Sequence, residues 1–118
     1  MRALLLALFL AVSPPLLADA VPAATRDPET HFFQAKFGDF KAELAAAREQ
    51  GKQGVFLFFE MDECPFCARM KATVLNQAAV QDAFRRDFLV YTIDVNGDLA
   101  MTDFAGRDTT EKAFALEN

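Results

Sequence analysis

The sequence has no tryptophan, one tyrosine and only two cysteines, and no proline follows Pro65. Five glycines and five prolines in 118 residues are too few for a low-complexity or collagen-like chain. Basic residues are also in the minority, with 12 against 17 acidic residues and a formal net charge of −5. Such a chain has no electrostatic footprint for a phosphate backbone or an anionic lipid surface, so nucleic acid is not an expected partner.

Phenylalanine and aliphatic residues are abundant. The 13 phenylalanines and a hydrophobic fraction of 53% supply material for one packed aromatic core, while 25% of the residues are charged. This balance predicts one small soluble domain rather than a disordered tail or a fibre.

The first twenty residues are typical of a secretory signal peptide. A single positive charge at Arg2 precedes an apolar run over 3–12, and small residues at Ala18 and Ala20 favour cleavage before Val21. The alternative is a membrane anchor, but a spanning helix needs roughly 20 apolar residues and this run is shorter. No cysteine lies in the run or directly after it to accept a lipid. We therefore expect a periplasmic or otherwise secreted protein with no membrane anchor after cleavage.

The rest of the chain divides into a short leader over 21–30 and a domain over 31–118. The leader shows no pattern that demands packing. Within the domain, apolar spacing predicts an amphipathic helix over 40–50, with Asp39 as its N-cap and Gly51 as its stop.

Strands and helices then alternate. The apolar run 55–59 predicts a strand buried on both faces, and the stretch after the cysteines predicts a helix through Leu75. The remaining expected elements are a helix over 80–87, a strand over 88–95 with a turn at Asn96-Gly97-Asp98, and a helix over 111–116 capped by Thr109 or Thr110. This order predicts an α/β layer fold with parallel pairing.

Cys64-Pro65-Phe66-Cys67 lies between the predicted strand and helix. Pro65 suits the first turn of a helix, where its missing N–H costs nothing. Cys64 would then sit among free backbone N–H groups at the positive end of the helix dipole, which favours a thiolate. Cys67 lies one turn further on the same face. The spacing predicts that Cys64 attacks a partner disulfide and that Cys67 resolves the mixed disulfide.

Other interpretations of the pair remain open. A structural disulfide is one, although closing so short a loop removes little entropy from the unfolded chain. A zinc site would need two more ligands, and His31 is the only histidine, so no metal or other cofactor is expected. Haem attachment requires a histidine where Ala68 stands. We interpret His31 as an ordinary surface or packing residue.

Charged neighbours could tune the pair in either direction. Asp62 and Glu63 oppose a thiolate, whereas Arg69 and Lys71 favour one if they point back toward it. Glu60 ends the predicted strand and is a candidate proton shuttle for Cys67; the alternative is a solvated strand end. The direction of the redox reaction is therefore not fixed by the sequence.

These features together resemble the thioredoxin superfamily, and more narrowly its exported branch typified by SoxW. The stretches that carry the resemblance are His31-Phe32-Phe33, Phe37-Gly38-Asp39, Gly51-Lys52, Val55 to Glu60 running into the Cys-x-x-Cys, Met70, Val80-Gln81 to Phe88, Ile93-Asp94-Val95, Gly97-Asp98 and Glu111-Lys112.

The resemblance implies a thioredoxin fold and thiol-disulfide exchange, with Cys64 as nucleophile and Cys67 as resolving thiol. It also implies a protein disulfide substrate and a membrane thiol-electron donor of the DsbD or CcdA kind. Glu63 stands where many thioredoxins have tryptophan, and Phe58 stands at the position of the family's buried aspartate, so substrate preference is not inherited.

A further departure is the missing cis-proline loop. The superfamily follows that loop with two antiparallel strands and a closing helix, and the sequence has no proline after Pro65. We expect a domain that is incomplete at its C-terminus, a fragment or truncated product, with an open sheet edge that a homodimer would cover. A disulfide reductase is the leading hypothesis; a disulfide oxidase or isomerase, and a non-catalytic binding module, are the alternatives.

Overall fold

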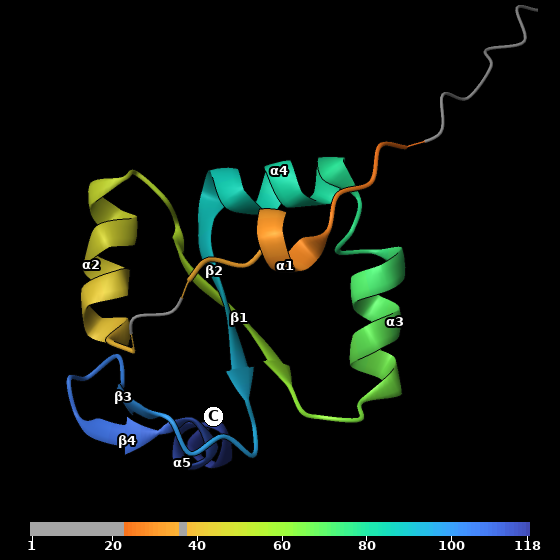
Figure 1. Ribbon diagram of the computed structural model, residues 1–118. Helices are drawn as coiled ribbons and strands as arrows, with labels where there is room; N and C mark the ends of the chain where they lie inside the picture. Colours follow the sequence, from red (N-terminus) through yellow and green to blue (C-terminus); the bar gives the residue numbers. More distant parts are fainter. Residues whose placement is uncertain (1–22, 36–37) are drawn as a thin grey trace, which may run out of the picture.

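The computed structural model describes residues 23–35 and 38–118 (Figure 1). The predicted signal peptide and Phe37 lie outside the described residues. The elements in chain order are α1 (Pro28–His31), α2 (Phe40–Glu49), β1 (Gly54–Glu60), α3 (Pro65–Thr73), α4 (Ala78–Asp87), β2 (Phe88–Asp94), β3 (Ala100–Thr102), β4 (Asp108–Thr110) and α5 (Glu111–Glu117).

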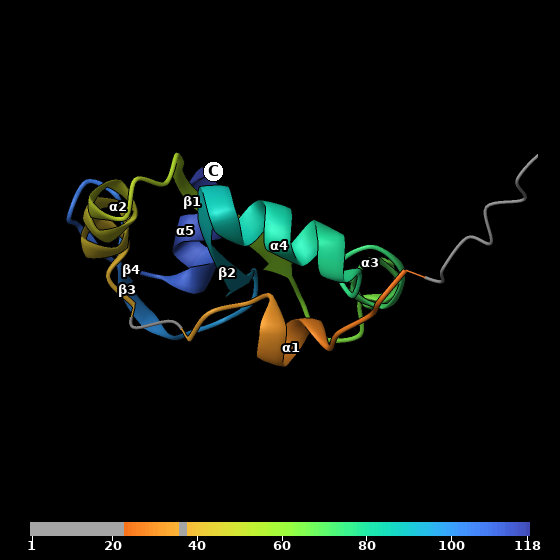
Figure 2. The same cartoon turned by 90° about the horizontal axis from the view of Figure 1, so that it is seen from above.

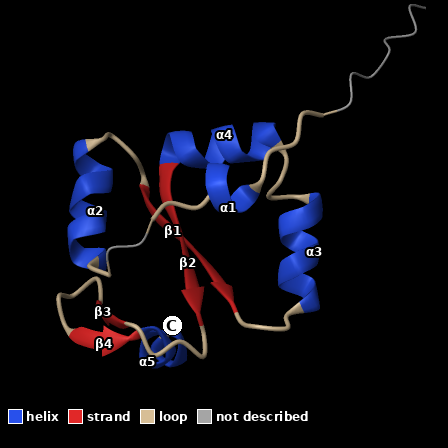
Figure 3. Ribbon diagram, viewed as in Figure 1, coloured by secondary structure: helices blue, strands red, loops and turns tan. Residues whose placement is uncertain are grey.

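The central sheet consists of β1 and β2, which pair in parallel from Gly54 opposite Phe88 to Glu60 opposite Asp94. Parallel strands need a crossover, and α3 and α4 supply it. Helices α2 and α3 lie on either side of the sheet, and α4 crosses one end of it (Figures 1 and 3). The mixed α/β architecture confirms the predicted fold class. Within the described residues, β1 has no strand on its other edge.

Alternate side chains of the two strands enter two separate cores. Val55 and Leu57 of β1 pack into the first core, which is built from α2, β2, β3 and α5. Phe56 and Phe58 pack into the second core, which α1 and α4 cover. The buried members of the first core are Phe40, Ala47, Leu89, Tyr91, Ile93, Met101 and Phe114, and those of the second are Phe32, Phe33, Leu75 and Val90. The predicted packing of 55–59 on both faces is therefore confirmed, although these side chains are half-buried or exposed rather than fully buried.

Helix ends follow the predicted capping residues. The Asp39 carboxylate accepts a hydrogen bond from the Ala42 N–H at 2.9 Å, and Gly51 follows α2 with a left-handed φ of 69°. Of the two candidate caps for α5, Thr110 is the one that accepts from Ala113, at 3.3 Å. The helix predicted through Leu75 stops earlier, because the N–H groups of Val74 and Leu75 both turn back to the Met70 carbonyl.

The short antiparallel pair β3 and β4 was not predicted. Three residues per strand are too few for a visible alternation of apolar and polar side chains. The turn between the strands is closed by Asp103, whose carboxylate accepts from the N–H groups of Ala105 and Arg107 at 2.8 and 2.9 Å. This pair extends the first core through Met101.

The described part of the segment preceding Phe32, which begins at residue 23, is packed, and this corrects the expectation of a leader without packing. Backbone hydrogen bonds join Arg26 to Asn76 and Ala78 to Ala24, at 2.8 and 2.9 Å. Helix α1 spans the predicted boundary between leader and domain, and its first residue, Pro28, is buried. Viewed from above, α1 lies below α4 in the picture, between α2 on the left and α3 on the right (Figure 2). The described part of this segment is therefore structural.

No helix in the described part of the chain is both long and apolar enough to cross a bilayer.

Candidate redox site

Cys64 and Cys67 form a disulfide at the start of α3, with Cα atoms 5.3 Å apart. Cys64 is the N-cap residue and Pro65 follows at the first helical turn, as predicted. The Cys67 N–H donates a hydrogen bond to Cys64 Sγ at 3.2 Å, so the sulfur takes the place of the usual capping oxygen. Because a donor and the positive end of a helix dipole face Cys64 Sγ, reduction of the pair would leave a stabilised thiolate there.

A surface cavity of about 500 Å³ opens on the disulfide. Both cysteines line it, together with Glu60 at the end of β1 and Lys71 on α3. Both cysteines are half-buried. An incoming sulfur can reach the pair from this side.

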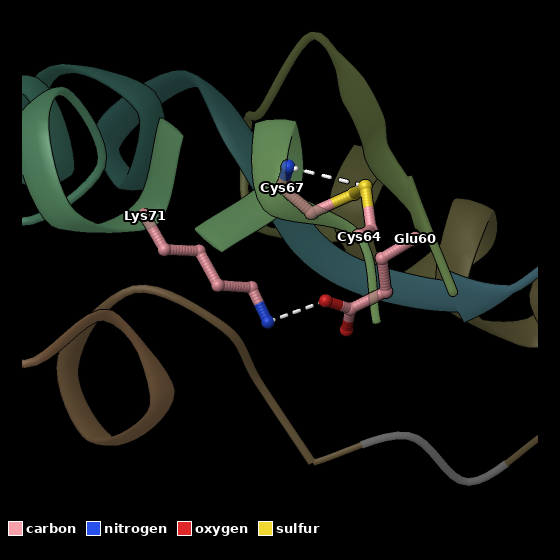
Figure 4. Close-up of a disulfide and its surroundings, with 4 residues drawn as sticks. All are labelled: Glu60, Cys64, Cys67 and Lys71. Carbon is pink, nitrogen blue, oxygen red and sulfur yellow. Dashed lines mark hydrogen bonds and ion pairs between the residues drawn. A yellow bond between two sulfur atoms is a disulfide. The ribbon is translucent and has the colours of Figure 1, made fainter. Parts of the chain in front are cut away.

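Lys71 joins three elements beside the disulfide (Figure 4). Its Nζ lies 2.5 Å from the Glu60 carboxylate of β1 and 2.6 Å from the Glu29 carboxylate of α1. The same Nζ lies 5.2 and 5.8 Å from the ring centroids of Phe33 and Phe58. Glu60 is therefore half-buried and ion-paired, which contradicts the alternative of a solvated strand end.

The protonation state of Lys71 follows from these contacts. Burial alone would lower the pKa of the ammonium group, but the hydrogen bonds to Glu29 and Glu60 outweigh it. The pKa of Lys71 is raised above its ordinary value of 10.5. The Lys71 side chain is therefore positively charged at every pH near neutrality.

The loop before the disulfide is acidic and exposed. Asp62 and Glu63 line the cavity rim. Glu63 has a φ of 53°, in the left-handed region that non-glycine residues rarely occupy. Arg69 is exposed and lies away from this cavity, against Met70 and Thr73. Of the two cations considered from the sequence, only Lys71 points back toward the pair.

Helix α3 contains no buried residue. Phe66, Met70 and Val74 recur at helical spacing along it and are 83%, 42% and 38% exposed. The element that carries the cysteines is therefore attached chiefly through its ends and through Lys71.

The remaining predicted residues fall outside this site. His31 is exposed at the end of α1, and its carbonyl accepts from Arg85 at 2.9 Å. Among residues 23–35 and 38–118, no group of three or more His, Cys, Asp or Glu side chains is placed to hold a metal ion. Glu29 was missed in the sequence, because nothing in its spacing links it to a residue 42 positions further along the chain.

A parallel strand pair with a Cys-x-x-Cys at the N-terminus of the crossover helix is typical of thioredoxin-like domains. Residues 40–118 match the family model of the thioredoxin-like domain, and the chain belongs to this family. Searches of curated proteins and of solved structures each found no match.

Proposed function

We propose that the protein is an exported disulfide reductase that acts on protein substrates through its Cys64–Cys67 dithiol. The position of Cys64 carries the proposal. Its sulfur lies on an open cavity and accepts the Cys67 N–H, which is the environment that a nucleophilic thiolate needs. Export is proposed from the signal-like residues 1–20, and a SoxW-type role from the resemblance alone.

The exchange proceeds in two steps. Cys64 thiolate attacks one sulfur of the substrate disulfide, which forms a mixed disulfide and releases one substrate thiol after protonation. Cys67 then loses its proton, and its thiolate attacks Cys64 Sγ and releases the second substrate thiol. Two electrons pass from the dithiol to the substrate, and the protein is left as the disulfide of Figure 4.

Glu60 is the proposed acceptor of the Cys67 proton. Its carboxylate lines the same cavity as Cys67, and the ion pair with Lys71 holds it in place. A second dithiol must return two electrons to the protein, and the family resemblance suggests a membrane thiol transporter of the DsbD or CcdA kind for this role.

The charges around the cavity support the reductase direction. Glu60, Asp62 and Glu63 line the cavity with a single cation, Lys71, and Glu29 also neutralises that cation. This excess of negative charge partly offsets the stabilisation of the Cys64 thiolate by the helix N-terminus, which favours the disulfide and makes the dithiol the better electron donor. An oxidase or isomerase would need the opposite balance.

Trapping in the periplasm tests the proposal. Replacing Cys67→Ser removes the resolving thiol, so mixed disulfides between Cys64 and substrates are expected to accumulate and to disappear on addition of dithiothreitol. The matched variant, Cys64→Ser, keeps one cysteine in the same motif and is expected to capture nothing. If neither variant captures a protein, the binding-module alternative replaces the proposed reductase.

Equilibration of the pair with a glutathione redox buffer tests the direction. A reductase is expected to have a reduction potential well below that of a strong periplasmic oxidant, which is about −120 mV. A potential at or above that value would identify an oxidase or isomerase.

A further inference from the structure

Between its two ends, the redox helix α3 is linked to other elements by the ion pairs of one side chain, Lys71. Helix α3 buries none of its residues, so apolar packing contributes little to its position. Lys71 lies one turn beyond Cys67 and is the residue of α3 that forms ion pairs with other elements. Its Nζ lies 5.2 and 5.8 Å from the ring centroids of Phe33 and Phe58, two neighbouring aromatic residues of the second core.

The two carboxylates that hold Lys71 come from two different elements that both precede it in the sequence. Glu60 ends β1 and shares the cavity with the cysteines. Glu29 belongs to α1, within the segment that precedes the family match at 40–118. The side chains of Lys71 and Glu60 are only 20% and 24% exposed, so solvent screens this pair less than an ordinary surface ion pair.

We propose that Lys71 is a positioning residue that anchors the redox helix and sets the equilibrium between dithiol and disulfide, and that Glu29 and Glu60 regulate it by neutralising its charge. The N-terminal segment is thereby part of the redox site. This inference rests on the proposed thiol chemistry of Cys64 and Cys67, and it extends that chemistry to residues that no Cys-x-x-Cys motif contains.

The charges around Cys64 determine the direction in which each variant shifts the equilibrium. In the reduced protein Cys64 carries negative charge, which the nearby ammonium group stabilises and the nearby carboxylates destabilise. Removing Lys71's charge therefore favours the disulfide. Removing the charge of either glutamate leaves the ammonium less neutralised and favours the dithiol. A purely structural role would produce shifts of the same sign in all variants, because each one breaks the same anchor.

The protein is purified from cells that express the whole chain. It is then equilibrated with a mixture of reduced and oxidised glutathione. Two glutathione thiols reduce the protein disulfide and become one glutathione disulfide, and the oxidised fraction is counted by thiol alkylation and mass spectrometry. In Lys71→Met the equilibrium is expected to move about threefold toward the disulfide, a shift of the size expected for a partly exposed ion pair. Glu29→Gln and Glu60→Gln are expected to move it about twofold toward the dithiol.

Two further variants complete the test. Lys71→Arg retains the charge and is expected to stay near the wild-type equilibrium. Arg69→Met removes a positive charge from the exposed face of the same helix and is expected to change the equilibrium by much less than Lys71→Met. Loss of the proton acceptor in Glu60→Gln slows the approach to equilibrium, but the twofold shift of the end point comes only from the lost charge, because an equilibrium position does not depend on the rate.

The inference is overturned if Lys71→Met and Glu29→Gln move the equilibrium in the same direction, or if neither moves it while the wild-type pair exchanges normally. Failure of the proposed function looks different. In that case Cys67→Ser captures no substrate, although the opposite shifts in the glutathione equilibrium are still observed.

Discussion

The backbone N–H of Cys67 donates a hydrogen bond to Cys64 Sγ at 3.2 Å. One residue of the pair thus caps the helix through its sulfur, while the other supplies the donor. The two cysteines are consequently inequivalent before any substrate arrives, and the N-terminal one is prepared for attack.

In the reduced protein we expect Cys64 to react with iodoacetamide at neutral pH roughly tenfold faster than Cys67, because thiolates and not thiols are alkylated. Peptide mapping by mass spectrometry after a short reaction measures both rates. The variants Cys64→Ser and Cys67→Ser provide the rate of each thiol alone. Equal rates in the reduced wild type would show that the helix terminus does not activate Cys64.

The packing of the N-terminal segment depends on Gln81. This side chain is fully buried, and its Nε2 donates to the carbonyls of Arg26 and Leu75 at 3.0 and 2.8 Å. Gln81→Met leaves both carbonyls without this donor and is expected to lower the free energy of unfolding by about 1–2 kcal/mol. Urea denaturation measures the loss. Gln77→Met, at the N-cap of the same helix, removes an exposed hydrogen bond and is expected to cost less than about 0.5 kcal/mol.

Stability is expected to fall at alkaline pH through Tyr91. Burial, and then the hydrogen bond and charge of Glu43, raise the pKa of Tyr91 far above its ordinary value of 10.0. The folded state therefore holds the phenolic proton more tightly than the unfolded state does. This contribution is complete below about pH 10 and is lost as the pH rises beyond it.

Urea midpoints measured between pH 8 and 11 test this dependence. Tyr91→Phe removes the titrating group, so its midpoint is expected to fall less steeply across that range than the wild-type midpoint. Parallel curves for the two proteins would exclude Tyr91 as the source of the alkaline loss.

The backbone at Glu63 gives a stability prediction beside the redox pair. A left-handed conformation costs an ordinary L-residue about 1 kcal/mol or more, and a β-branched residue fits it worst. Glu63→Gly is expected to leave the free energy of unfolding unchanged or higher, whereas Glu63→Val lowers it by more than about 1 kcal/mol. Thermal unfolding of both oxidised variants checks the difference. A Val variant as stable as the Gly variant would contradict the assigned backbone conformation.

The sequence predicted the elements that have a strong local signal. The run of apolar residues in β1, the capping side chains of Asp39 and Thr110, and the Cys-Pro-Phe-Cys at a helix start all depend on neighbours within a few positions. Local chemistry of this kind is visible without a structure. The fold class and both cysteines were therefore predictable.

The contacts that were missed join residues far apart in the chain. Glu29 meets Lys71 across 42 positions, and Arg26 meets Gln81 across 55. No periodic pattern in the sequence indicates either pair, because both contacts depend on how α1 packs against the second core. The paired carboxylates on Lys71, and the structural role of the N-terminal segment, became apparent only once the elements were placed in space.

The lack of buried side chains in α3 also determines how the domain opens. We expect amide hydrogens in β2, which lies between both cores, to exchange with solvent only when the whole domain unfolds. Those of α3 are expected to exchange through a local opening that leaves the two cores intact, because this helix has no buried residue. The disulfide therefore sits on the part of the protein that can rearrange around a docking polypeptide at the smallest cost to the rest of the fold.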